Sequence, residues 1–283
     1  MAPGFDGNTA VYGVIGDPVS HSLSPQIHKY FADLCNVNMA YVPFHVKDLG
    51  SAIGGAHALG IRGLNVTVPH KKSIMPHILE CDDMAKKIDA VNTLVWMKSG
   101  YTGHNTDYTG IQRTAASMGI SFRGRCVAVL GAGGSAYAAA IAAADGQAKQ
   151  IMIINRTLES AFILASHVNS HYNIPIEVEN PSFRPEIIIQ ATTVGFGRLE
   201  GKSPVDLDFF KGAEMAFDLI YTPWETEFLR QAKEAGVPKI VNGFPMLVYQ
   251  AAAAFCLWHG PDSISDEEVH VKNLQGLLCN EKN

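Results

Sequence analysis

Two short segments each carry one ionisable group among small polar residues, where a predicted strand gives way to a loop. Lys71 ends the segment 65–71, Asn-Val-Thr-Val-Pro-His-Lys, and Asp107 ends the segment 105–107, Asn-Thr-Asp. An ammonium and a carboxylate that lie together can move a proton on and off a hydroxyl group. We therefore expect Lys71 and Asp107 to meet in the fold as an acid–base pair. The alternative interpretation of Lys71 is a surface lysine.

A glycine-rich turn lies between an apolar strand predicted at 126–130 and a helix of small residues predicted at 135–144. The expected cofactor-binding residues of this turn are Gly131, Ala132, Gly133, Gly134 and Ser135. In such a turn the first glycine allows the sharp bend and the second lets a pyrophosphate approach the backbone. The free N–H groups of the helix start then face that anion. The sequence predicts a Rossmann-type dinucleotide site and, with the acid–base pair, alcohol–ketone redox chemistry.

The strand predicted at 151–154 is followed by three polar residues, Asn155, Arg156 and Thr157. An NAD-selective site usually offers an acidic side chain here to the ribose 2′-hydroxyl, and this segment has none. A guanidinium with amide and hydroxyl neighbours can instead hold a 2′-phosphate by charge-assisted hydrogen bonds. We therefore predict NADP as the cofactor, whereas Glu159 nearby leaves NAD possible.

The composition restricts the class of partner. A net charge of −5 over 283 residues argues against nucleic acid or an anionic membrane, so we expect a small-molecule substrate. The N-terminus lacks a basic stretch followed by an apolar one, and the alanine-rich run 136–144 is too short to span a bilayer. The five cysteines are scattered and odd in number, which is typical of reduced thiols in a cytoplasmic protein. His167 and His171 have no third ligand nearby, so no metal is expected. We expect a cytoplasmic monomer or homodimer.

The first part of the chain alternates between apolar strands and helices. The expected strands are 11–15, 40–46, 64–68 and 93–97, and the expected helices are 24–34, 48–59 and 84–88. Ser24 is expected as the N-cap of the first helix, with Pro25 at its first position. This β-α-β-α-β order predicts a mostly parallel sheet covered by helices.

The same alternation restarts after Asp107. A connecting helix at 108–118 leads to strands expected at 126–130, 151–154, 187–190, 215–220 and 239–241. This part predicts a doubly wound nucleotide domain at 107–243. The helices expected at 247–258 and 266–278 have no strand left to pair, so we expect residues 244–283 to return to a substrate domain at 1–106. A cleft between the two α/β domains would then bind the ligands.

Taken together, these segments resemble the shikimate dehydrogenase family from about Val11 to Gly260. The matching segments are 21–25, 65–71, 90–93 (Ala-Val-Asn-Thr), 105–107, 131–134, 155–157 and 246–250 (Met-Leu-Val-x-Gln). The resemblance implies NADP-linked interconversion of 3-dehydroshikimate and shikimate, in the chorismate pathway of aromatic amino acid biosynthesis. It also implies the catalytic pair Lys71 and Asp107.

The resemblance further implies a set of binding residues. Ser22 and Ser24 would donate to the substrate carboxylate, with Tyr221 near it. Asn65, Thr67, Asn92 and Gln250 would hold the ring hydroxyls, and Gly243 would lie beside the nicotinamide. Short hydroxyl and amide side chains suit a polyhydroxylated ring because they form several directional hydrogen bonds.

The chain departs from the family's usual pattern at a few positions near the expected site. Tyr108 and Asp89 stand where the family usually has glycine, and Phe244-Pro245 where small residues are common. Tyr137 and Ser160 stand where many members have basic residues. These departures leave cofactor preference and the ring substrate open. The alternatives are a quinate dehydrogenase, or one for a related ring acid, using NAD or either cofactor, and a non-catalytic dinucleotide-binding regulator.

Overall fold

A computed structural model describes residues 5–178 and 182–280, with side chains to residue 278. The chain divides into two compact units, Met1–Thr109 with Val248–Asn283, and Gly110–Leu247. The C-terminal segment from Val248 therefore belongs to the first unit. The boundaries fall inside two helices, α4 (Asp107–Ser117) and α8 (Phe244–His259).

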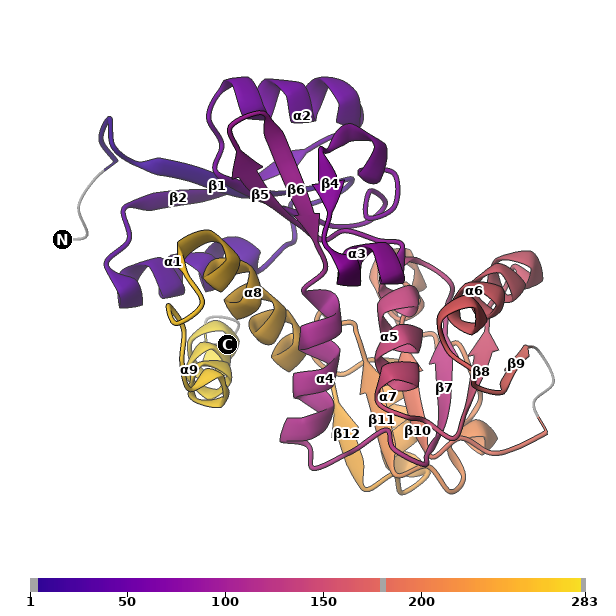
Figure 1. Cartoon of the computed structure of the whole chain (residues 1–283). Coiled ribbons are helices and arrows are strands. Elements are labelled where there is room, and N and C mark those ends of the chain that lie inside the picture. The colour runs from indigo at the N-terminus through magenta and orange to yellow at the C-terminus, as the bar shows by residue number, and fades with distance from the viewer. Residues whose placement is uncertain (1–4, 179–181, 281–283) are drawn as a thin grey trace. The chain divides into compact units, whose positions relative to one another are not determined.

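The first unit contains a mixed six-stranded sheet in the order β2-β1-β3-β5-β6-β4 (Figure 1). The strands are β1 (Ala10–Gly16), β2 (Met39–His45), β3 (Gly63–Val66), β4 (Glu80–Cys81), β5 (Thr93–Met97) and β6 (Gly100–His104). β1 is parallel to β2 and β3, and β4 is parallel to β6, whereas β5 is antiparallel to both of its neighbours. Three of the five pairings are therefore parallel. The carboxyl ends of β1 and β3 share one edge of the sheet, and the polar residues that follow these strands lie there.

Helices cover both faces of this sheet. They are α1 (Ser24–Cys35), α2 (Leu49–Ala58), α3 (Asp83–Ile88), the short 3-10 helix η1 (Met75–His77), α8 and α9 (Glu267–Asn280). α2 packs on one face through a core that includes Ile53, Ile15 and Leu64. α1 and α8 cover the other face (Figure 1). On that face the Tyr12 ring lies 4.9 Å from that of Trp258.

Two local predictions in the first unit were wrong. The N-cap of α1 is Leu23 and not Ser24, and the side chain of Leu23 makes no capping hydrogen bond. Ser22 Oγ instead accepts a hydrogen bond from the Ser24 N–H at 3.2 Å, so the serine that holds the turn lies two residues earlier. The sequence pattern also missed β6, which pairs with β5 as a hairpin.

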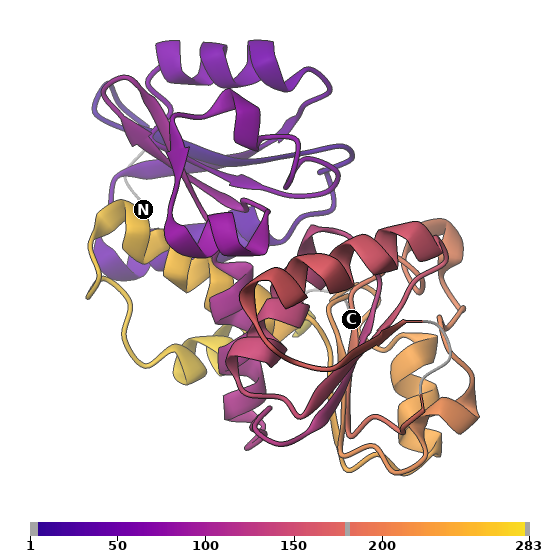
Figure 2. The same cartoon turned by 45° about the vertical axis from the view of Figure 1, so that its right-hand side comes forward.

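The second unit is a fully parallel sheet in the order β12-β11-β10-β7-β8-β9. Its strands are β7 (Cys126–Leu130), β8 (Gln150–Ile154), β9 (Ile176–Val178), β10 (Ile187–Gln190), β11 (Met215–Asp218) and β12 (Lys239–Val241). Its helices include α5 (Gly134–Asp145), α6 (Leu158–His171) and α7 (Glu227–Glu234), with 3-10 turns η2 (Gly197–Leu199) and η3 (Leu207–Phe210). Figure 2 shows the red α5 and α6 and the orange α7 on opposite faces of the sheet. This is the predicted doubly wound arrangement.

Several features of the described residues bear on the functional class. None of their helices has the length and apolar character needed to cross a bilayer. Within the same residues, no three His, Cys, Asp or Glu side chains gather as a metal site would require. The four cysteines whose side chains are described, Cys35, Cys81, Cys126 and Cys256, are free thiols.

Candidate active site

Lys71 and Asp107 meet in the first unit. The chain turns after β3, and the N–H of His70 donates to the Thr67 carbonyl at 2.9 Å, which starts the turn that carries Lys71. Asp107 is the first residue of α4. Lys71 Nζ donates to Asp107 Oδ2 at 2.5 Å, and the two side chains are only 13% and 5% exposed. Lys71 is therefore not a surface lysine, and the expected pair forms.

The side chains on either side of Lys71 contact other groups. His70 is buried, and its Nε2 lies 2.7 Å from the Val46 carbonyl. Lys72 Nζ lies 2.9 Å from Asp89 Oδ2. Asp89 occupies the left-handed C-cap position of α3 (φ 58°), a backbone conformation that suits glycine. The aspartate adds the side chain that pairs with Lys72. The Lys71 carbonyl accepts from the Val91 N–H at 2.7 Å, which fixes the backbone under the lysine.

A buried amide network holds the other carboxylate oxygen of Asp107. Asn92 Nδ2 donates to Asp107 Oδ1 at 2.9 Å and lies 3.3 Å from Gln250 Oε1. Asn92 Oδ1 accepts from the Thr106 N–H at 2.7 Å. Asn92, Thr106 and Gln250 are all buried. Gln250 is therefore not a polar residue on an exposed helix face, because it reaches the predicted site from α8.

The remaining predicted substrate residues of the first unit lie at or just after the ends of β1 and β3. Asn65 is on β3, next to Val14 of β1, and its Nδ2 donates to the Asn92 carbonyl at 3.2 Å. Thr67 follows β3 and is half-buried. Ser22 is half-buried and Ser24 buried, in the segment from the end of β1 into α1. The first unit thus holds six of the seven predicted substrate residues at one sheet edge or in the amide network beside it.

The sequence did not single out two residues that the structure connects to this network. Thr106 stands inside the Asn-Thr-Asp segment, so its neighbours were a signal for it. Tyr41 lies on β2, and its hydroxyl donates to Asn65 Oδ1 at 2.7 Å. No local motif marks Tyr41, because the contact passes across β1.

The glycine turn of the second unit leaves room for an anion. Gly131 has φ 119°, and a Cβ on it would lie 3.0 Å from the Ala191 carbonyl oxygen, so glycine is required. Gly133 is the N-cap of α5, has no side-chain cap, and has open space where a Cβ would be. The N-cap residue of α5 therefore has no side chain that could accept from the first N–H groups of the helix. These features fit a pyrophosphate.

The segment 155–157 fits a 2′-phosphate. Asn155 Nδ2 donates to the Thr157 carbonyl at 2.9 Å, which shapes the turn, and Thr157 is the N-cap of α6 without a side-chain cap. Arg156 is exposed and takes part in no ion pair among residues 5–178 and 182–280. The exposed Glu159 in the first turn of α6 opposes an anion. Tyr137 is buried, with its ring 5.2 Å from that of His167, so it does not replace the basic residue of the family.

Gly243 and Tyr221 also lie in the second unit. A Cβ on Gly243 would lie 2.2 Å from the Leu219 carbonyl oxygen, so only glycine fits against the segment that carries Tyr221. Asp218 holds the start of this segment by accepting from the Ile220 N–H at 2.9 Å and from the Thr226 hydroxyl at 2.5 Å. Burial raises the pKa of Asp218 to about 7. Tyr221 thus belongs to a different unit from the other six predicted substrate residues.

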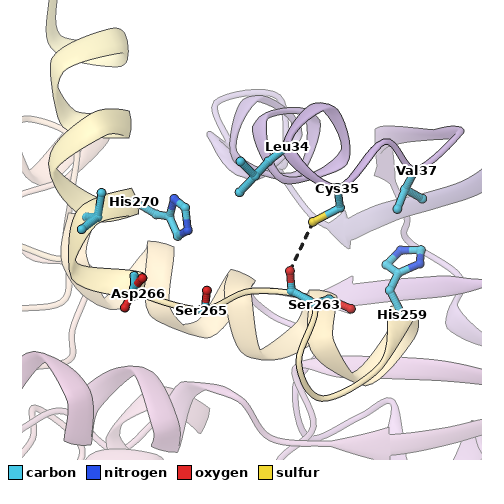
Figure 3. Close-up of a pocket in the computed structure, with 9 residues that line it drawn as sticks. Leu34, Cys35, Val37, His259, Ser263, Ser265, Asp266 and His270 are labelled. Atoms are coloured by element: carbon cyan, nitrogen blue, oxygen red, sulfur yellow. Dashed lines mark hydrogen bonds between the residues drawn. The ribbon is translucent and has the colours of Figure 1, made fainter.

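A separate hollow of about 690 Å³ lies in the first unit between the end of α1 and the chain leading into α9 (Figure 3). Figure 3 shows Cys35 and His259 facing Ser263, and Cys35 Sγ donates to the Ser263 carbonyl at 3.3 Å. None of the predicted site residues lines this hollow. It has no part in the chemistry of the Lys71–Asp107 pair.

One unit contains a buried lysine–carboxylate pair. The other contains a glycine-rich helix start without a side-chain N-cap, on a parallel sheet. These are the features of an NAD(P)-dependent oxidoreductase that acts on a CH–OH group. Residues 14–94 match the model of the shikimate dehydrogenase substrate binding domain. The chain is 42% identical over 281 residues to a shikimate dehydrogenase (NADP(+)) of Caldanaerobacter subterraneus subsp. tengcongensis, covering 97% of this chain and 99% of that protein. The chain belongs to the shikimate dehydrogenase family.

Two solved structures agree with this assignment. A shikimate dehydrogenase in complex with NADP+ superposes with a TM-score of 0.85 at 35% identity, over 95% of each chain. The shikimate 5-dehydrogenase of Listeria monocytogenes in complex with shikimate and NAD superposes with a TM-score of 0.84 at 29% identity, over 95% of this chain and 97% of that one.

Proposed function

We propose that this protein is an NADP-dependent shikimate dehydrogenase that interconverts 3-dehydroshikimate and shikimate, with Lys71 and Asp107 as its acid–base pair. The observation that supports the proposal most strongly is the buried contact of 2.5 Å between Lys71 Nζ and Asp107 Oδ2. Because Asn92 holds the second oxygen of the same carboxylate, the pair has a fixed orientation. A structural ion pair would not need the row of hydroxyl and amide groups beside it.

The first unit would hold the ring and move the proton. In the reductive direction the Lys71 ammonium gives a proton to the ketone oxygen, and in the oxidative direction the neutral amine takes it back from the hydroxyl. The Asp107 carboxylate orients the Lys71 amine and balances the positive charge of the lysine when the amine is protonated. The hydride for the ring carbon would come from bound NADPH, and bound NADP+ would accept it in the reverse direction.

The polar residues near the pair would set the position of the ring. Ser22 and Ser24 would donate to the substrate carboxylate, with Tyr221 near it. Asn65, Thr67, Asn92 and Gln250 bind the ring hydroxyls. Removal of one such partner would cost about 1–3 kcal/mol of binding free energy, because the remaining group stays buried and unpaired. The reacting hydroxyl is thereby held at Lys71 Nζ.

The second unit would hold the cofactor. The backbone from Gly131 to Ser135 would hold the pyrophosphate, and Arg156 would bind the 2′-phosphate together with Asn155 and Thr157. Gly243 leaves room for the nicotinamide. In this proposal residues 1–106 with 244–283 form the substrate domain, and 107–243 form the NADP domain.

A matrix of steady-state rates tests the substrate and the cofactor together. Shikimate and quinate are each oxidised with NADP and with NAD, and we expect the highest kcat/KM for shikimate with NADP. A higher kcat/KM for quinate would contradict the proposal in favour of a quinate dehydrogenase. Tight NADP binding without turnover of either acid would favour the non-catalytic regulator.

NAD remains the specific alternative cofactor, because Glu159 lies close to Arg156 in the sequence and the Listeria relative was solved with NAD. We also propose a cytoplasmic protein that is a monomer or a homodimer. Light scattering of the purified protein at working concentrations distinguishes these two states.

A further inference from the structure

Tyr41 contacts the proposed substrate residue Asn65 from two strands away. Its hydroxyl donates to Asn65 Oδ1 at 2.7 Å, although β1 lies between β2 and β3. On its other side, Asn65 Nδ2 donates to the Asn92 carbonyl at 3.2 Å and to Thr93 Oγ1 at 3.1 Å. All three contacts belong to the first unit, and Asn65 is buried.

A side-chain amide has two orientations of nearly the same shape, with oxygen and nitrogen exchanged. Only the oxygen can accept the Tyr41 hydroxyl proton in the observed geometry, and only the nitrogen can donate to the Asn92 carbonyl. In the flipped orientation Asn65 Oδ1 would face the Asn92 carbonyl oxygen, and neither atom could donate a hydrogen bond. The Asn92 carbonyl, which can only accept, therefore selects the amide orientation, and the Tyr41 hydroxyl adds the hydrogen bond that holds the amide oxygen in place. The Asn92 side chain in turn holds Asp107.

The ring of Tyr41 is itself held by a stacked partner. The His28 imidazole lies parallel to it, with centroids 4.2 Å apart and planes 11° apart. His28 is fully buried, and neither ring nitrogen has a partner within hydrogen-bond distance, although Asn65 lies close enough to raise its pKa slightly. Burial dominates and lowers the pKa of His28 to about 3, so the stacked ring is neutral. A neutral partner leaves the Tyr41 hydroxyl directed at Asn65.

We infer that Tyr41 is a positioning residue for ring recognition, which fixes the Asn65 amide so that one orientation faces the ring hydroxyls. The inference rests on the proposed function, since Asn65 is assigned there to the substrate. Tyr41 acts through Asn65 and does not itself touch the substrate.

The test compares Tyr41→Phe with Tyr12→Phe. Tyr12 is the register partner of Tyr41 on β1, and its ring packs on the same aromatic cluster, so its variant controls for loss of a hydroxyl on that face. We expect Tyr41→Phe to raise the KM for shikimate about tenfold, as loss of one buried hydrogen bond would. The kcat and the KM for NADP should change less than about threefold, and Tyr12→Phe should resemble the wild type. Equal KM values for shikimate in the two variants would refute the inference.

A double-mutant cycle with Asn65→Ala gives a second readout. If Tyr41 acts through Asn65, Tyr41→Phe should have no further effect on the KM for shikimate in the Asn65→Ala background. Additive effects would contradict the inference. Absence of shikimate turnover in the wild type would refute the proposed function instead, so the two failures are distinguishable.

A third measurement needs no change at Tyr41 and applies if Tyr41→Phe does not fold. The side-chain amide of Asn65, assigned by comparison with Asn65→Ala, should give one sharp pair of NMR signals in the wild-type protein before and after shikimate is added. Exchange between two amide orientations in the free protein would contradict the inference, because the amide would then not be held in place.

Discussion

His28 should make the stability of the protein sensitive to acid. The imidazole is fully buried among rings, and burial lowers its pKa from 6.5 to about 3. A group whose folded pKa lies below its unfolded value contributes stability that is complete above the unfolded pKa and is lost as the pH falls toward the folded pKa. The window for His28 therefore runs from pH 6.5 down to about pH 3.

The expected magnitude follows from this window. Each pH unit below the unfolded pKa costs about 1.4 kcal/mol, so the loss between about pH 7.5 and about pH 5 is about 2 kcal/mol. His28→Phe keeps a flat ring against Tyr41 and removes both unpartnered nitrogens. The unfolding free energy of His28→Phe relative to the wild type should therefore increase by about 2 kcal/mol as the pH falls from about 7.5 to about 5.

The comparison with a variant is necessary because Asp218 has the opposite effect. Burial raises the pKa of this carboxyl from 3.8 to about 7, so its contribution is complete below pH 3.8 and is lost as the pH rises to about 7. In the wild type the two dependences largely cancel. The difference between His28→Phe and the wild type removes the Asp218 contribution, which both proteins share.

Urea unfolding followed by far-UV circular dichroism at about pH 5 and about pH 7.5 measures this difference. Tryptophan fluorescence gives a second probe, because the Trp258 ring lies 5.1 Å from that of His28. A difference in unfolding free energy that is the same at both pH values would refute the reasoning, because it would mean that His28 is protonated equally in the folded and unfolded states.

Three further predictions test other parts of the molecule. Arg156→Ala should raise the KM for NADP by about 10–100-fold and leave that for NAD nearly unchanged in steady-state assays, whereas equal losses would mean that Arg156 does not bind the 2′-phosphate. Asp218→Asn should gain stability relative to the wild type as the pH rises from about 4 to about 7, by about 1.4 kcal/mol per pH unit in urea titrations, and a loss would contradict its raised pKa. Gly243→Ala should lower the Tm by several degrees, because its Cβ would lie 2.2 Å from the Leu219 carbonyl oxygen, and an unchanged Tm would show that the segment yields easily.

Motifs at strand ends made much of the candidate site predictable. Lys71 stands in a short segment directly after a predicted strand, whereas the segment of Asp107 follows β6, which was not predicted. The small polar neighbours in both segments marked the two residues. The glycine turn was predictable because Gly131 follows a continuous apolar strand and opens a helix of small residues. In both cases the residue types that the site needs stand next to one another in the sequence.

Features that depend on tertiary contact were not predictable. β6, Gly-Tyr-Thr-Gly-His, has two glycines and little apolar alternation, and it forms because β5 pairs with it. A Cβ on Gly103 would lie 2.5 Å from the Ile78 side chain, so packing and not strand propensity explains that glycine. Tyr41 lies on a strand that carries no motif, and only the sheet order brings it to Asn65.

The central claim is that the amine of Lys71, held by Asp107, moves the hydroxyl proton, and Lys71→Ala against Lys72→Ala tests it most directly. Lys72 is the adjacent lysine but pairs with Asp89, so its variant removes a similar side chain from outside the pair. We expect Lys71→Ala to lower kcat for shikimate oxidation by about 100-fold or more with unchanged NADP binding, and Lys72→Ala to stay within about threefold of the wild type. Near-normal turnover in folded Lys71→Ala protein would contradict the account.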